Sequence, residues 1–113
     1  MEHIPQSKAR HFENGAVNSW EYEMKGVSFN VAPISIKGRY PENGYVTNTV
    51  SDSIVHVIDG SGLLAIHDGT MVQLARNDQV HLKIGNAYYF DGNLEIIYAA
   101  SPAWTAQQTE HIN

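Results

Sequence analysis

Apolar and polar residues alternate along most of this chain, and Gly, Asn, Asp or Pro interrupts the alternation every several residues. Val80, Leu82 and Ile84 alternate with polar neighbours. Ile34 and Ile36 do the same, and so do Leu94, Ile96 and Tyr98. A period of two places successive side chains on opposite faces of a β-strand. Many short strands separated by turn residues are typical of an all-β sandwich or barrel. No segment has the periodicity of a helix longer than a turn or two.

Two runs, residues 54–58 and 63–66, are apolar on both faces. Such runs are typical of strands that lie between layers or beneath a partner subunit. We therefore expect a homodimer. The residues 67–70, with the sequence HDGT, follow the second run, and Asp-Gly between two apolar runs indicates a β-hairpin.

The size and charge of the chain narrow its class. A length of 113 residues fits one domain, and we expect an N-terminal arm at 1–15, where periodicity is weak, and a single domain at 16–113. The formal net charge of −5 argues against a nucleic-acid partner. No segment is long and apolar enough to span a membrane, and the N-terminus lacks the apolar core of a signal peptide. The chain has no Cys, which is compatible with the expected cytoplasmic location.

Three segments carry a resemblance to a known family. They are GRYPENGY at 38–45, SIVHVIDGSG at 53–62 and LKIGNAYYFDG at 82–92. Together they resemble the two motifs of the small cupins, a family of metal-binding β-barrels. The resemblance extends over most of the chain, and it implies a cupin-type jelly-roll β-barrel.

The metal positions of the cupin motifs carry other residues here. Alignment of the first motif on Gly60 places Val46 and Asn48 at its two His and Ser53 at its Glu. Alignment of the second motif on Gly85 places Tyr88 at its His. Valine has no lone pair, the Asn and Ser oxygens are neutral, and a tyrosine must lose a proton with an ordinary pKa of about 10. We therefore expect no metal at the family site and no cofactor.

The same residues suit a hydrogen-bonding pocket. Asn48 can donate and accept, Ser53 has a rotatable hydroxyl, Tyr88 has a polar tip on an apolar ring, and Val46 adds to an apolar lining. The first hypothesis is a metal-independent cupin-domain protein that binds a small polar or carbohydrate-like molecule in the barrel interior. The alternative for these polar residues is that they satisfy one another or a buried water.

Two enzyme hypotheses stay open beside this one. The first is a metal-independent isomerase, epimerase or cyclase with Tyr88 as its acid. This hypothesis lacks a base, because Glu21 and Glu95 lie on strands whose opposite faces are apolar and are expected to face solvent. The second is a metal-dependent dioxygenase-type cupin, which lacks the family's ligands.

Six histidines raise the question of a different metal site. His56 and His81 are expected on outer strand faces, and His67 is expected to be solvated before its turn. A surface or structural role is the first interpretation, and a zinc or nickel site formed by His56 and His81 is the alternative. The remaining histidines lie near the ends of the chain and are His3, His11 and His111.

Arg39 is expected to form a structural salt bridge, with a ligand carboxylate as the alternative.

Overall fold

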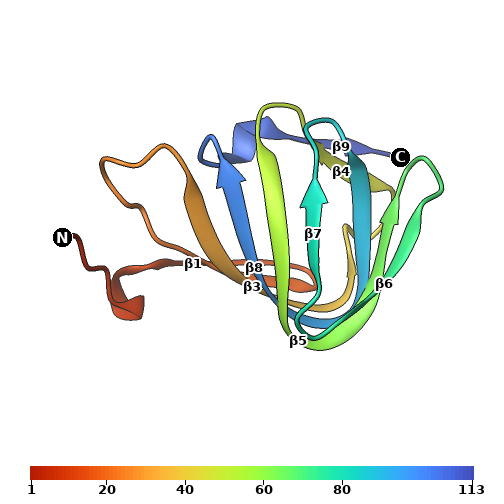
Figure 1. Cartoon of the computed structure of the whole chain (residues 1–113), viewed down its shortest axis with the longest axis horizontal. Coiled ribbons are helices and arrows are strands. Elements are labelled where there is room, and N and C mark those ends of the chain that lie inside the picture. Colours follow the sequence, from red (N-terminus) through yellow and green to blue (C-terminus); the bar gives the residue numbers. More distant parts are fainter.

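The computed structural model describes residues 1–113, and nine strands make up most of it (Figure 1). The only helices are two short 3-10 turns, and neither is long and apolar enough to cross a membrane. The all-β prediction is therefore confirmed. The elements are η1 (Gln6–Lys8), β1 (Arg10–Asn14), β2 (Val17–Glu21), β3 (Asn30–Tyr40), β4 (Tyr45–Asn48), β5 (Asp52–Ile66), β6 (Met71–Ala75), β7 (Gln79–Leu82), β8 (Ala87–Ser101), η2 (Ala106–Gln108) and β9 (Thr109–Ile112).

The strands form one antiparallel sheet with β8 at its centre. β3 pairs with one edge of β8 and β5 with the other, and both pairings run along most of the strand. β2 and β1 extend the sheet beyond β3, while β6 and β7 pair with the outer edge of β5. β4 pairs with the beginning of β8 and with β9. Figure 1 shows the sheet curled into a cup, with β5 and β8 bending from one wall to the other.

The bend of β5 depends on Gly60. Its φ of +87° lies in the left-handed region, and a Cβ at this position would clash with the backbone carbonyl oxygen of Asn93 in β8. A shift in the pairing of β5 with β8 lies just before it, which is typical of a β-bulge. This motif glycine therefore lets β5 curve and continue up the opposite wall of the cup.

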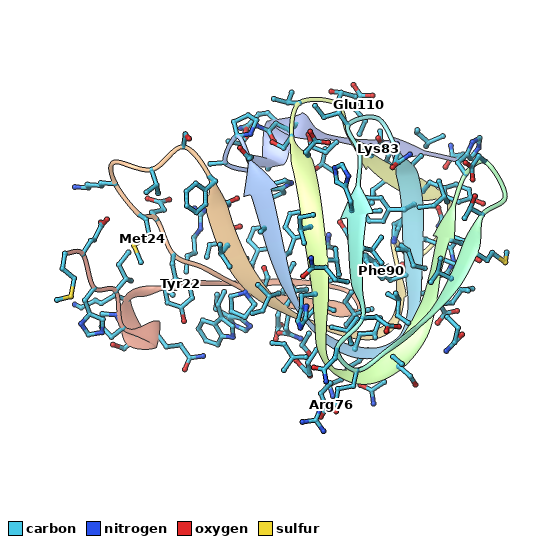
Figure 2. The ribbon with its side chains drawn as sticks, in the orientation of Figure 1. Tyr22, Met24, Arg76, Lys83, Phe90 and Glu110 are labelled. Carbon is cyan, nitrogen blue, oxygen red and sulfur yellow. The ribbon has the colours of Figure 1, made fainter.

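Apolar side chains from alternate strand positions fill the interior of the cup. Figure 2 shows Phe90 inside the cup and Arg76 pointing away from it. Leu82 is buried as the alternation predicts, but Ile84 is exposed because β7 ends before it. The largest fully buried apolar side chains are Ile36, Val55, Val57, Leu64, Leu74, Leu94 and Ile96. The period of two thus indicated the inner faces of β3 and β8 correctly.

Part of the predicted N-terminal arm belongs to the sheet. Residues 10–14 form β1, which pairs with β2 of the same chain along its whole length. This hairpin places Phe12 and Asn14 beside the interior of the cup. The division into an arm at 1–15 and a domain at 16–113 stays a prediction.

Candidate functional site

A cavity of about 270 Å³ lies inside the cup, between β1, β2, β3, β4, β8 and the C-terminal segment. Thirteen of its twenty lining residues are hydrophobic. Small-molecule sites usually combine such a lining with a few convergent polar groups, at about 300 Å³ or more for drug-sized ligands. This cavity therefore suits a smaller ligand. Its polar groups include Asn14, Ser19, Glu21, Asn30, Tyr40, Thr47, Asn48, Tyr88, Tyr98 and Thr109.

Three tyrosines bring phenol groups to this cavity. Tyr40 lies at the end of β3, and the bend of β8 brings Tyr88 and Tyr98 from its two ends to the same cavity. Burial raises the pKa of Tyr40 and Tyr98, and it raises the pKa of Tyr88 well above the ordinary value. Interactions with Tyr98 and Tyr40 raise the pKa of Tyr88 further. At neutral pH these groups are protonated, and as neutral hydroxyls they can donate and accept hydrogen bonds.

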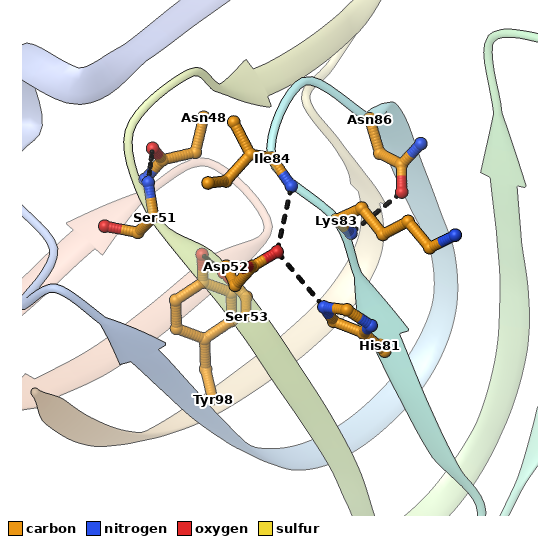
Figure 3. Close-up of polar contacts among 9 residues, drawn as sticks. All are labelled: Asn48, Ser51, Asp52, Ser53, His81, Lys83, Ile84, Asn86 and Tyr98. Atoms are coloured by element: carbon orange, nitrogen blue, oxygen red, sulfur yellow. Dashed lines mark hydrogen bonds and ion pairs between the residues drawn. The ribbon is translucent and has the colours of Figure 1, made fainter.

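Three of the four predicted ligand-binding residues, Val46, Asn48 and Tyr88, line this cavity. The fourth, Ser53, does not line it, but its Oγ lies 2.6 Å from the hydroxyl oxygen of Tyr98, which does (Figure 3). The sequence missed a further hydroxyl, that of Thr47. Thr47 lines the cavity and its Oγ1 is buried without a hydrogen-bond partner.

Both polar atoms of the Asn48 side-chain amide form hydrogen bonds within the protein. Its Oδ1 accepts hydrogen bonds from the backbone N–H groups of Val50 and Ser51, each at 2.8 Å. Its Nδ2 donates to Oε1 of Gln108 at 3.0 Å. Asn48 therefore has little capacity left for a ligand, and its partners are not the other predicted site residues.

The C-terminal segment closes one side of the cavity. Trp104 and Thr109 line it, and Nε1 of Trp104 donates to Oγ1 of Thr109 at 3.1 Å. Oε1 of Gln108 accepts from both Nδ2 of Asn48 and Oγ of Ser51, each at 3.0 Å. These bonds tie the last residues of the chain to the turn between β4 and β5.

The positions of the cupin metal ligands do not fit a metal. Val46 offers no donor atom, and the amide of Asn48 is engaged with the backbone and Gln108. The raised pKa of Tyr88 disfavours the phenolate that a metal would need. In the whole structure, no group of three or more His, Asp or Glu side chains could hold a metal ion.

None of the six histidines lines the cavity. His56 lies opposite Gln79 across β5 and β7, and its Nδ1 is 3.1 Å from Oε1 of Gln79. Nε2 of His81 is 3.1 Å from Oδ1 of Asp52 (Figure 3). This hydrogen bond, with one from the backbone N–H of Ile84, lowers the pKa of Asp52. The two histidines therefore have separate partners on the outer face.

Arg39 does not form the salt bridge that the sequence suggested. Its guanidinium donates to the carbonyl oxygens of Pro41 at 2.7 Å and Gly44 at 3.1 Å, and it lies 3.9 Å from the centre of the Tyr89 ring. Arg39 thus fixes the turn between β3 and β4. The expectation of a salt bridge was wrong, because the turn carbonyls occupy the guanidinium.

Glu21 is the charged group that the sequence placed wrongly. The expectation that it faces solvent is contradicted, because its side chain is only 17% exposed and lines the cavity. Its Oε2 lies 2.6 Å from Nη2 of Arg10, whose side chain is 65% exposed. Arg10 holds the carboxylate from the solvent side, and the cavity lies on the other.

The alternation of inner and outer residues along β2 explains why the expectation for Glu21 was wrong. Val17 and Ser19 are buried, so Glu21 follows them on the inner face. Trp20 stacks on His11 at 4.4 Å between ring centres, on the other face. The alternation of aromatic and acidic residues continues past the end of β2, and it therefore suggested the opposite face. Glu95 does not line the cavity, and its Oε1 accepts a hydrogen bond from Oγ of Ser35 at 2.9 Å.

Glu21 and Tyr98 lie on either side of Ala32 at one level of the cup. Ser19 pairs with Ile34, so Glu21, two residues on, lies at the level of Ala32, which pairs with Tyr98. Neighbouring strands are about 4.8 Å apart, which puts the backbones of Glu21 and Tyr98 about 10 Å apart. The small side chain of Ala32 leaves room between the carboxylate and the phenol. The site therefore has a carboxylate on one side and a phenol on the other.

No protein-family model and no curated protein matches the chain. Solved structures do match it. The nucleoside dehydratase Pac13 has a TM-score of 0.89 at 16% identity, over 100% of this chain and 92% of that chain, and Streptomyces Pac13 structures with uridine give the same TM-score. Ectoine synthase from P. lautus has a TM-score of 0.79 at 14% identity, over 100% and 91% of the two chains. The polyketide cyclase RemF from Streptomyces resistomycificus has a TM-score of 0.70 at 13% identity, over 89% and 79%.

At these identities the likeness shows the fold alone. The matched structures are cupin-fold proteins, as is oxalate decarboxylase from Bacillus subtilis, which also matches. The curled antiparallel sheet of this chain agrees with this comparison. The chain is a small cupin-like domain, built as a jelly-roll β-barrel.

Proposed function

We propose that this domain binds a small, hydroxyl-rich molecule of sugar or nucleoside size inside the barrel. The observation that carries the proposal is the cavity of about 270 Å³, whose apolar walls surround a few hydroxyl, amide and carboxylate groups. The unpaired hydroxyl of Thr47 adds to this, because buried polar groups normally have partners. The likeness to Pac13 structures with uridine supports a ligand of this size.

Metal independence is part of the proposal. It is supported by the chemistry of Val46, Asn48 and Tyr88, which do not fit a metal, rather than by the likeness to other cupins. The dioxygenase hypothesis loses support for the same reason, since its chemistry depends on a ligand set that these residues do not supply.

A second candidate function is a metal-independent acid–base enzyme, such as an isomerase, epimerase or cyclase. The observation that favours it is Glu21, because the sequence supplied an acid in Tyr88 but no base. General acid–base catalysis needs groups that take and give protons at positions around one substrate. Glu21 is the base in this candidate, and Tyr88 is the acid. Pac13 is a nucleoside dehydratase and RemF a polyketide cyclase, and the likeness to these two proteins supports a catalytic role as the second candidate.

The variant Tyr88→Phe tests the binding proposal. It removes one hydroxyl from the cavity and keeps the ring, which packs edge-on against Phe90 at 5.6 Å. A ligand group left without its partner costs about 1–3 kcal/mol, so the affinity for uridine should fall roughly 5- to 100-fold. Isothermal titration calorimetry in the presence of a chelator measures this and tests metal independence at the same time.

Tyr89→Phe is the matched control. Tyr89 is the next residue along β8, but it lies on the outer face against Arg39 and Tyr45 and does not line the cavity. Its replacement should leave uridine affinity unchanged. Equal losses in both variants, or no loss in either, would remove Tyr88 from the site.

We also propose that the domain forms a homodimer through the outer face of β5. Ile54 and Ile58 are 37% and 45% exposed there, and His56 between them lies opposite the half-buried Ile97 of β8. An apolar patch of this kind is typical of a subunit interface. Light scattering during gel filtration should give twice the chain mass of 12.6 kDa. The variant Ile54→Lys should give a monomer, and a monomeric wild type would contradict the proposal.

A further inference from the structure

The charged groups at the cavity are of one sign. The chain has seven Lys and Arg and six His, and none of them lines the cavity, whereas Glu21 does. Arg10 reaches Glu21 from the solvent side, and Arg39 is bound to the carbonyls of its own turn. Arg76 points away from the cup (Figure 2). A ligand inside the barrel therefore contacts the carboxylate of Glu21, and the cation beside it, Arg10, is already paired with that carboxylate.

An anionic group would lose its hydration in this cavity without gaining a counter-charge. Proteins usually bind phosphate and carboxylate groups through Arg or Lys, or through the free N–H groups at a helix N-terminus. The two helical turns of this chain have three residues each and supply no such terminus. Burial of an unpaired charge among mostly apolar residues is costly, and Arg10 is not free to neutralise it because Glu21 occupies its guanidinium.

The hydroxyl groups of a ligand, in contrast, have hydrogen-bond partners in this cavity. Arg10 binds Oε2 of Glu21, which leaves Oε1 as an acceptor for a ligand hydroxyl. On the other side of Ala32, the neutral phenol of Tyr98 can donate or accept, with Tyr40 and Tyr88 beside the same cavity. A molecule with several hydroxyls can therefore bind both sides at once.

We infer that the cavity takes neutral, polyhydroxylated molecules such as free nucleosides or sugars and excludes their phosphorylated forms, with Glu21 as the specificity-determining residue. This inference rests on the proposed binding function. It adds that the ligand is uncharged, which follows from the side chains that line the cavity and not from the fold.

Two matched pairs of probes test the inference by calorimetry near neutral pH. They are uridine with uridine 5′-monophosphate, and ribose with ribose 5-phosphate. In the wild type, the neutral member of a pair should bind, and its phosphate ester should bind roughly 10- to 100-fold more weakly, as expected when a charged group is buried without a partner. This comparison needs no variant, so it does not depend on the folding of one.

Glu21→Gln identifies the residue responsible. Glutamine has nearly the same shape, removes the negative charge and releases the guanidinium of Arg10. The preference for uridine over its monophosphate should therefore shrink at least about tenfold. Arg10→Gln is the matched control, because it breaks the same ion pair but keeps the carboxylate, and the preference should persist. In the double variant, any phosphate affinity gained from the released Arg10 should be lost again.

The outcomes separate this inference from the proposed function. Equal binding of both members of a pair by the wild type would overturn the inference and leave the binding function intact. Failure of both neutral probes to bind at millimolar concentration would overturn the two together. An unchanged preference in a folded Glu21→Gln variant would overturn the role of Glu21.

Discussion

Replacement of Gly60 by Ala is expected to lower the free energy of unfolding by about 2–5 kcal/mol. The left-handed backbone of Gly60 costs a residue with a Cβ about 1–2 kcal/mol, and the clash with the Asn93 carbonyl adds about 1–3 kcal/mol. The neighbour is backbone in the central strand, so it cannot move aside as a flexible side chain would. Thermal unfolding should show a loss of at least about 8 °C.

Gly69→Ala is the control for this prediction. Gly69 also has a positive φ, of +98°, but nothing lies within 4 Å of its missing Cβ. This variant should show only the cost of the backbone conformation, about 1–2 kcal/mol. If both variants lost the same stability, the close approach of β5 and β8 would contribute nothing at Gly60.

A rise in pH above about 10 is expected to destabilise the fold steeply. Burial raises the pKa of Tyr40, Tyr88 and Tyr98, so above the ordinary pKa the unfolded chain loses these protons while the folded chain retains them. The folded state then binds more protons than the unfolded state, and the free energy of unfolding falls as the pH rises. Each tyrosine contributes up to about 1.4 kcal/mol per pH unit in that range, and below it the three contribute no pH dependence.

Urea unfolding at a series of alkaline pH values measures this slope. Tyr88→Phe should reduce the slope by the share of one tyrosine, because its ring stays buried without a titrating group. Tyr89→Phe, on the outer face, serves as the comparison. A slope that does not differ between Tyr88→Phe and the wild type would contradict the assignment of Tyr88 to a buried phenol.

The architecture was predictable because its signals are local or carried by motif glycines. Alternation identified the inner faces of β3 and β8, and the motif that contains Gly60 indicated the barrel but not the bend of β5 at this residue. The same alignment placed Val46, Asn48 and Tyr88 at the cavity, because the fold fixes these positions whatever residue occupies them. The homodimer, the cytoplasmic location and the absence of nucleic-acid partners stay predictions.

The rest of the site depends on where the strands end and on how they pair, which alternation alone does not fix. Glu21 lines the cavity only because β2 ends there in the phase set by Val17 and Ser19. Tyr98 approaches Ser53 because β8 pairs with β5 in one particular register. The role of Asn48 likewise required the position of the C-terminal segment, which lies sixty residues away in the chain.

The hydrogen bonds of Asn48 also restrict how this barrel can change in evolution. At the position where a metal-binding cupin has a histidine, this chain has the amide that joins three separate backbone and side-chain groups. Asn48→His would add one metal ligand and at the same time detach Gln108 and loosen the wall formed by the last residues. A metal site that includes this position would thus need several coordinated substitutions, with a less stable cavity as the intermediate. The hydrogen bonds of Asn48 therefore favour the retention of an amide at this position.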